Sequence, residues 1–166
     1  MGEALDFEAF CLRQNPALIR LLTLYCGDGE MARDVAQETL TRAWVHWRKV
    51  ERMERPDLWA KRVAINLANS QFRHRRVQQR RLHQLADVRT QAGPDFGDRL
   101  LVREAISALT PRQRMAILLR YLEDLSVEQT SDLMGCSQGT VKKLTARALA
   151  ELRAVIGTDV EVHTDA

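Results

Sequence analysis

Long apolar runs are missing from this chain of 166 residues. No stretch approaches the roughly 20 apolar residues that a membrane-spanning helix needs, so we expect no membrane partner. The first ten residues hold three acidic side chains and no basic one, which argues against a signal peptide. We therefore expect a cytoplasmic protein.

Cysteine is scarce, and Cys11, Cys26 and Cys136 are scattered. They form no C-x-x-C pair, and no histidine lies at zinc-ligand spacing from them, so we expect no metal site and no cofactor. We interpret the three as buried thiols in a reducing compartment. The sequence also lacks a carboxylate pair, a Ser/Cys–His arrangement and a phosphate-binding glycine loop, so we expect no catalytic residues and no enzyme.

The alternating pattern of a half-buried strand is absent as well, because apolar residues recur at intervals of three and four. Capping signals such as Asn15-Pro16, Pro56-Asp57 and Thr110-Pro111 mark helix starts, and glycines mark the ends. We predict an all-α protein. The expected helices span residues 4–14, 16–26, 30–48, 57–84, 98–109, 112–122, 126–134 and 138–156.

One segment between these helices has no sustained apolar stripe and contains Gly93-Pro94. This pattern indicates a flexible linker between two small helical domains. We predict a first domain over 1–84, the linker over 85–97, a second domain with a helix-turn-helix over 98–156, and a disordered tail over 157–166.

Acidic residues are absent from positions 58–86, which hold seven of the 25 basic side chains. On a helix, steps of 4, 3, 4, 3 and 4 make one stripe of Arg62, Asn66, Asn69, Arg73, Arg76 and Arg80. Lys61, Arg75 and Arg81 would widen this cationic surface, and Trp59, Val63 and Leu67 would be buried beside it. Solvated helices usually mix charge signs to gain i,i+4 pairs, so this face favours a polyanion partner over solvent alone.

The preceding helix has a different character. Its predicted core side consists of Ala36, Leu40, Ala43, Trp44 and Trp47. Its other side is acidic and polar, with Asp34, Gln37, Glu38 and Thr41. Such a side would repel DNA, and it suits either solvent or a basic protein surface.

A helix-turn-helix is predicted near the C-terminus. Ser126 to Gln129 form a capping box, and Leu133-Met134-Gly135-Cys136-Ser137 ends one helix and starts the next. The second helix would bury Val141, Leu144 or Thr145, Ala148, Leu152 and Val155. It would expose Lys142, Lys143, Ala146 and Arg147. Because the second helix of this motif enters the major groove, Gln138 and Thr140 would meet bases, unless the pair is only a hairpin with a solvated basic face.

These motifs resemble those of one known protein family. Asp34 to Trp44 (DVAQETLTRAW) resembles the conserved helix in the second region of bacterial RNA polymerase sigma factors, and Gly135 to Lys142 (GCSQGTVK) resembles the helix-turn-helix of their fourth region. Between them, Trp59 to Ala68 is similar to the helix that melts and reads the −10 element. The order and spacing resemble the small extracytoplasmic-function (ECF) type, most of all its actinobacterial SigE-like group.

The resemblance implies a factor that binds core RNA polymerase and directs promoter recognition, DNA melting and transcription initiation. It implies contacts with promoter DNA and with the β′ clamp helices and β flap of the polymerase, and it leaves open whether an anti-sigma factor exists. The implied polymerase contacts are Asp34, Gln37, Glu38 and Thr41. The implied −10 contacts are Lys61, Arg62, Asn66, Asn69, Arg73, Arg76 and Arg80. The loop Val50–Pro56 would hold a flipped base. The implied −35 contacts are Gln138, Thr140, Lys142, Lys143 and Arg147.

Two alternatives stay open from the residues alone. Leu109 to Gln113 and the Gly135 to Lys142 segment also fit the effector domain of a DNA-binding regulator that acts without core polymerase. The third hypothesis is a helical adaptor that uses its basic segment to dock a protein. Binding to promoter DNA alone, only with polymerase, or not at all distinguishes the three.

Overall fold

The computed structural model describes residues 6–81 and 97–156. Within these ranges the ordered elements are helices and no strand is present, which confirms the predicted all-α class. The chain divides into two compact units at Gln91–Ala92, and each is described by itself. Most of the predicted linker and all of the predicted tail lie outside the described residues, so these parts of the domain division stay predictions.

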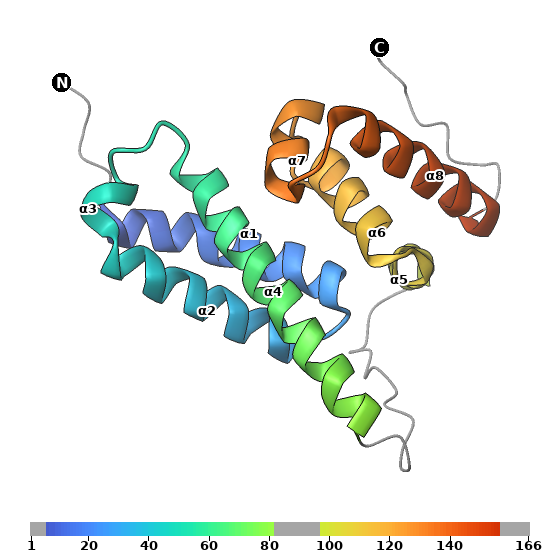
Figure 1. The fold of residues 1–166 in the computed structure, drawn as a ribbon, viewed down its shortest axis with the longest axis horizontal. Helices are drawn as coiled ribbons and strands as arrows, with labels where there is room; N and C mark the ends of the chain where they lie inside the picture. Colours follow the sequence, from blue (N-terminus) through green and yellow to red (C-terminus); the bar gives the residue numbers. More distant parts are fainter. Residues whose placement is uncertain (1–5, 82–96, 157–166) are drawn as a thin grey trace. The chain divides into compact units, whose positions relative to one another are not determined.

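The first unit contains α1 (Phe7–Cys26), α2 (Gly29–Val45), the single turn α3 (Trp47–Val50) and α4 (Pro56–Arg81). Figure 1 shows α1, α2 and α4 as the long helices of this unit. Each of these three helices packs against the other two, and the short α3 lies against α2. The contacts bury a core between them, because each helix has one apolar face.

The prediction of two helices separated at Pro16 is wrong, because α1 runs unbroken through this proline. Proline inside a helix removes one backbone hydrogen bond. Here α1 has fully buried residues on both sides of the proline, including Phe10 and Leu18. Packing over the whole length outweighs the local preference. Asp6 caps the start of the helix, and Gly27 ends it with φ +71°.

Small residues make the inner face of α4. Ala60, Ala64 and Ala68 are fully buried, whereas the predicted core residues Trp59, Val63 and Leu67 are only half-buried. The alanines allow close approach of the neighbouring helices. At one end of this core the ring of Trp47 lies 5.1 Å from that of Phe7 and 5.2 Å from that of Phe10. The aromatic and alanine layers together fix where α4 lies on α1 and α2.

The second unit contains α5 (Gly97–Ala108), α6 (Pro111–Ile117), the π-helical turn η1 (Leu118–Leu122), α7 (Val127–Met134) and α8 (Gln138–Ile156). The helix predicted over 112–122 is thus interrupted by the π turn. After it, Asp124 takes φ +50°, and the guanidinium of Arg120 donates a hydrogen bond to the Leu125 carbonyl. This bond closes the bend that redirects the chain into α7.

Helix α8 packs against α5, α6 and α7. Val141 and Ala148 are fully buried, and Leu152 is half-buried. Val155 is 59% exposed, so its predicted burial is wrong. The residues from Arg153 to Val155 are all exposed.

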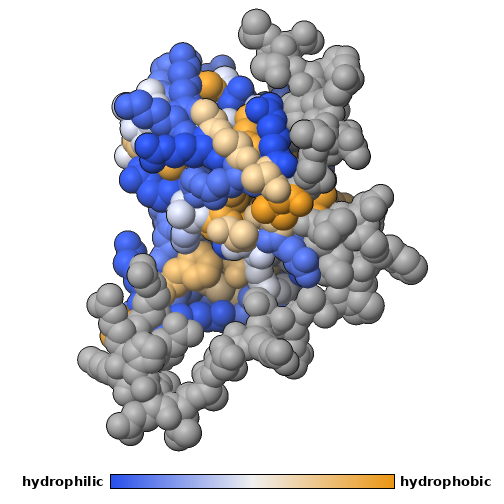
Figure 2. All heavy atoms as spheres, turned by 90° about the vertical axis from the view of Figure 1, so that its right-hand side faces the viewer, coloured by the Kyte–Doolittle hydropathy of each residue, from blue (hydrophilic) through white to orange (hydrophobic). Residues whose placement is uncertain are grey.

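Some large apolar side chains remain on the surface of the described residues, among them Leu12, Trp44, Val45 and Tyr121. Figure 2 shows one face of the molecule, on which hydrophobic residues are interspersed with hydrophilic ones. None of the described helices combines the length and the apolar character that a bilayer crossing requires.

Candidate functional site

The outer face of α4 carries part of the predicted cationic stripe. Arg62, Asn66 and Arg73 are exposed on it, at the spacing that places them along one side. Arg76 and Arg80 continue the same register in the backbone of α4, but their side chains lie outside the described residues. The exposed guanidinium groups can bind phosphate, and the Asn66 amide can donate to a base edge.

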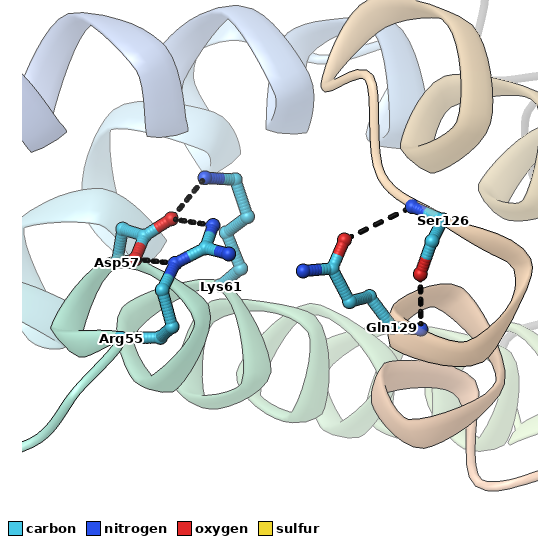
Figure 3. Close-up of polar contacts among 5 residues, drawn as sticks. All are labelled: Arg55, Asp57, Lys61, Ser126 and Gln129. Carbon is cyan, nitrogen blue, oxygen red and sulfur yellow. Dashed lines mark hydrogen bonds and ion pairs between the residues drawn. The ribbon is translucent and has the colours of Figure 1, made fainter.

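Lys61 does not belong to this surface, which corrects its predicted role. Its side chain is buried, with only 7% of the residue exposed. Its Nζ lies 3.9 Å from Oδ2 of Asp57, one turn earlier on α4. Arg55 also binds this carboxylate, with Nε 3.0 Å from Oδ1 and Nη2 2.8 Å from Oδ2 (Figure 3). The three side chains form an ion-pair cluster at the start of α4.

The charge of Asp57 is favoured by this cluster. Burial raises the pKa of its carboxyl group, but the hydrogen bond from Arg55 and the charges of Lys61 and Arg55 outweigh burial and lower the pKa below its usual value. The carboxylate also lies in the first turn of α4, where negative charge is stabilised. Asp57 therefore stays ionised and holds the end of the preceding loop.

That loop is anchored at both ends. Val50 is fully buried before it, and Pro56 begins α4 after it. Between them Arg52, Glu54 and Arg55 are exposed. The loop predicted to hold a flipped nucleotide base thus has a solvent-exposed middle between two anchored ends.

Asn69 also has a structural role that the sequence did not indicate. Its Oδ1 accepts a 2.6 Å hydrogen bond from the hydroxyl of the buried Tyr25. The residue is half-buried, unlike Asn66 one turn earlier. Its carbonyl oxygen therefore joins α4 to α1, and its contact with a base stays a prediction.

Arg75, expected to widen the cationic surface, is paired across the unit. Its Nη1 lies 2.9 Å from Oδ2 of Asp28, which also caps α2 by accepting from the amides of Glu30 and Met31. The pKa of Asp28 is lowered, chiefly by the hydrogen bond from the Met31 amide, then by Arg75, against an opposing effect of burial. One carboxylate thus joins the start of α2 to the C-terminal part of α4.

The acidic and polar side of α2 is exposed as predicted. Asp34, Gln37, Glu38 and Thr41 all face solvent. Glu38 accepts a 2.8 Å hydrogen bond from Nε of Arg42, so its charge is partly neutralised within the helix. Asp34 has no such bond among the described interactions. The more open carboxylate of this face is therefore that of Asp34.

Trp44 is 63% exposed, so its predicted place in the core is wrong. Its ring packs on one side against Phe7, with centroids 4.9 Å apart. It borders a groove between α1 and α2, together with Leu12, Ile19 and Leu40. Gln37 and Thr41 line the same groove, so the polar side of α2 continues into an apolar depression.

The helix-turn-helix has the local geometry that its caps predict. The Ser126 hydroxyl accepts from the Gln129 amide at 3.0 Å, and Gln129 Oε1 accepts from the Ser126 amide at 2.9 Å (Figure 3). Gly135 ends α7 in the left-handed conformation with φ +61°. Ser137 then caps α8, because its Oγ accepts from the amide of Thr140 at 3.1 Å.

Helix α8 presents a basic face. Lys142, Lys143 and Arg147 are exposed, and Gln138 is exposed at the start of the helix. Thr140 is half-buried, and its hydroxyl lies 2.9 Å from that of Ser137, so it takes part in the cap. The exposed cations and the amide of Gln138 suit phosphates and base edges.

Gln113 and Arg114 make contacts within the second unit that the sequence did not indicate. The Gln113 side chain completes the Thr110 capping box and donates from Nε2 to Oε1 of Glu151 on α8 at 2.7 Å. Arg114 donates to the carbonyls of Ile106, Ser107 and Leu109 at the end of α5. The sequence did not indicate the bond between Gln113 and Glu151, because the two residues lie 38 positions apart.

The cysteines show no clustering. Cys11, Cys26 and Cys136 are each half-buried and in no disulfide, and burial raises the pKa of Cys11. Within residues 6–81 and 97–156, no three or more His, Cys, Asp or Glu side chains gather in a way that could hold a metal ion.

Both units match known protein families. Residues 12–78 match Sigma-70 region 2, and residues 99–152 match Sigma-70, region 4. The RNA polymerase sigma-E factor of Streptomyces coelicolor is 34% identical over 154 residues, covering 92% of this chain and 87% of that protein. The ECF RNA polymerase sigma factor SigL of Mycobacterium tuberculosis is 33% identical over 163 residues, covering 93% and 91%.

A solved structure is also similar. The sigma factor RpoE from Bartonella quintana, crystallised with the anti-sigma factor NepR, has a TM-score of 0.83 and 26% identity. The likeness covers 93% of this chain and 99% of that chain.

Proposed function

The chain belongs to the extracytoplasmic-function family of RNA polymerase sigma factors, and we propose that its two helical units divide polymerase docking and promoter reading between them. One observation carries this proposal. The unit that matches Sigma-70 region 2 accompanies a helix-turn-helix in the same chain. A regulator that acts without polymerase needs only the helix-turn-helix, so the first unit favours the sigma factor.

The −10 element is assigned to the outer face of α4. Arg62, Asn66 and Arg73 are its exposed members, and Arg76 and Arg80 extend its register. Binding the melted strand better than the duplex shifts the equilibrium toward the open state. Stacking or pocketing one flipped base contributes about 1–3 kcal/mol, and phosphate contacts add to this. The loop anchored by Val50 and the Asp57 cluster is the proposed receiver of that base.

We assign core polymerase binding to the polar side of α2. Asp34, Gln37 and Thr41 are exposed beside the groove that Trp44 borders. A helical protein partner that brings cations to Asp34 and apolar side chains to the groove would complement both parts. Glu38 contributes less charge to this face than the sequence suggested, because Arg42 is bound to it.

The −35 element is assigned to α8. Lys142, Lys143 and Arg147 face away from the buried Val141 and Ala148. Gln138 lies at the N-terminal end, where a recognition helix meets base edges. Two modest DNA-binding units joined by a linker gain affinity through effective concentration, provided that polymerase sets their spacing. We therefore expect weak promoter binding by the free protein.

An anti-sigma protein is a proposed second partner, because the similar RpoE of Bartonella quintana was crystallised with one. Such a protein would compete with polymerase or DNA for the faces described above. The polymerase carries the chemistry of RNA synthesis, so the proposed role is non-enzymatic and cytoplasmic.

Transcription by reconstituted holoenzyme tests the proposal. On a fragmented genomic template, sequencing of transcript starts should reveal one shared promoter pattern. The variant Arg62→Ala/Arg73→Ala should retain core binding but lose permanganate reactivity of the −10 region. The control Arg13→Ala/Arg112→Ala removes two exposed cations outside the proposed DNA faces and should open DNA normally. Normal opening by the first variant would remove α4 from the mechanism.

The polymerase face has its own test. Asp34→Lys/Trp44→Ala should weaken core binding in a pull-down titration. The thermal unfolding midpoint should fall only slightly, because Asp34 is exposed and Trp44, 63% exposed, loses a contact on one side with Phe7. The matched control Arg13→Glu/Val45→Ala changes an exposed charge and an exposed apolar side chain that do not line this groove. Equal affinity of both variants and the wild type would refute the docking face.

A further inference from the structure

Gly139 occupies an exposed position in the first turn of α8. Ser137 caps this turn through the amide of Thr140, and its carbonyl accepts from the amide of Val141 at 3.1 Å. Because residues two apart on a helix point about 200° apart, Gly139 faces away from the fully buried Val141. It therefore lies on the side of α8 that is directed outward.

The fold does not require a glycine at this position. A Cβ placed on Gly139 would meet only Oγ of Ser137, at 3.9 Å, which is an ordinary contact. The backbone of Gly139 is helical and does not have the positive φ that distinguishes Gly135 at +61° in the turn. A Cβ therefore fits there without strain, and alanine is a better helix former than glycine. The chain thus holds a helix-weakening residue that neither space nor backbone demands.

The side chains around Gly139 indicate which kind of partner lies against its backbone. Lys142 and Lys143, three and four positions later, are exposed on the adjacent part of the helix. Gln138 is exposed beside it. A glycine flanked by cations at the start of a helix lets the helix backbone approach a polyanion more closely than any side chain would allow.

We propose that Gly139 is the point of closest approach between α8 and the −35 duplex, and that the DNA excludes a side chain there. This inference rests on the proposed function, since it needs α8 to be the −35 reader. It makes Gly139 a determinant of how deeply α8 enters the groove, and hence of which base edges Gln138 and its neighbours reach.

The test separates stability from binding in the full chain. Gly139→Ala should leave the thermal unfolding midpoint unchanged or raise it by up to about 4 °C. The promoter fragment for the binding test is one that wild-type holoenzyme transcribes. Holoenzyme carrying Gly139→Ala should bind this fragment with an affinity at least about fivefold lower than wild-type holoenzyme, which is the effect of a single base-pair mismatch. Gly139→Ser adds a Cβ as well and should reproduce the loss. A variant that is folded yet binds less well supports the proposal.

Gly29→Ala is the matched control, because this glycine also lies in the first turn of a helix and an added Cβ would meet Nη1 of Arg33 at an ordinary 3.5 Å. It should bind promoter like the wild type. Promoter affinity of Gly139→Ala and Gly139→Ser that equals or exceeds the wild-type value overturns the proposal. Lys143→Ala and Arg147→Ala distinguish the role of Gly139 from the assignment of α8 to the −35 element. If they weaken promoter binding while Gly139→Ala does not, only the role of Gly139 fails. If none of them weakens binding, the assignment of α8 to the −35 element fails as well.

Discussion

The hydroxyl of Tyr25 donates a 2.6 Å hydrogen bond to Oδ1 of Asn69, and this bond joins the end of α1 to the middle of α4. The Tyr25 ring is buried and meets Phe72 edge-on, with centroids 5.4 Å apart. A side chain predicted to read DNA therefore supports the helix that carries the proposed DNA-binding face.

Asn69→Ala should lower the free energy of unfolding by about 1–3 kcal/mol, because a buried hydroxyl loses an acceptor. Asn66→Ala, on the exposed side of the same helix, should change it by less than about 0.5 kcal/mol. Urea unfolding followed by circular dichroism measures both. Equal stabilities of the two variants would contradict a structural role for Asn69.

Arg62 and Lys61 are neighbours in sequence but should differ in their effect on DNA binding. Arg62→Ala should reduce the slope of log K against log salt for holoenzyme binding by about 0.7–0.9, the value for one lost phosphate contact. Lys61→Met retains most of the buried stem and should leave this slope unchanged, although stability falls because Asp57 loses a partner. An equal decrease in slope for both would mean that Lys61 reaches DNA.

Arg114 should be sensitive even to a conservative change. Its guanidinium donates to three carbonyls at 2.6 to 3.0 Å, and a lysine ammonium lacks the planar fork that reaches them together. Arg114→Lys should therefore destabilise the second unit by about 1–3 kcal/mol. Arg112→Lys, at an exposed position two residues earlier, serves as the control in thermal unfolding. Comparable midpoints for the two variants would show that these bonds contribute little.

Asp28 should make stability depend on pH in the acid range. Its pKa is lowered below 3.8 in the folded protein, so its contribution to stability is present above that value and is lost as the pH falls through the lower folded-state pKa. Asp28→Asn keeps a good helix cap but removes the charge that binds Arg75. The variant should be less stable than the wild type by about 0.5–1 kcal/mol at pH 7. The difference should shrink between pH 5 and pH 2.5 in urea unfolding, and a constant difference would contradict it.

Local signals in the sequence predicted much of the second unit. The capping boxes at Thr110 and Ser126 begin α6 and α7, and Gly135 ends α7. Each of these features joins residues three or four positions apart, so it can be recognised as a local pattern in the sequence. The exposure of Lys142, Lys143 and Arg147 followed in the same way, from the helical period relative to the buried Val141.

The sequence by itself determined the helical class, most helix ends and the side of α8 that faces outward, because each follows from interactions within a few residues. Only the tertiary structure decided that α1 continues through Pro16, that Lys61 and Asn69 serve the fold and that Trp44 is exposed. These outcomes depend on which faces of a helix its neighbours cover, and the neighbouring residues can be far away in sequence. Tyr25, for example, lies 44 positions from Asn69. Helical periodicity orders residues around an axis, but the position of the neighbouring helices decides how much of that face is buried.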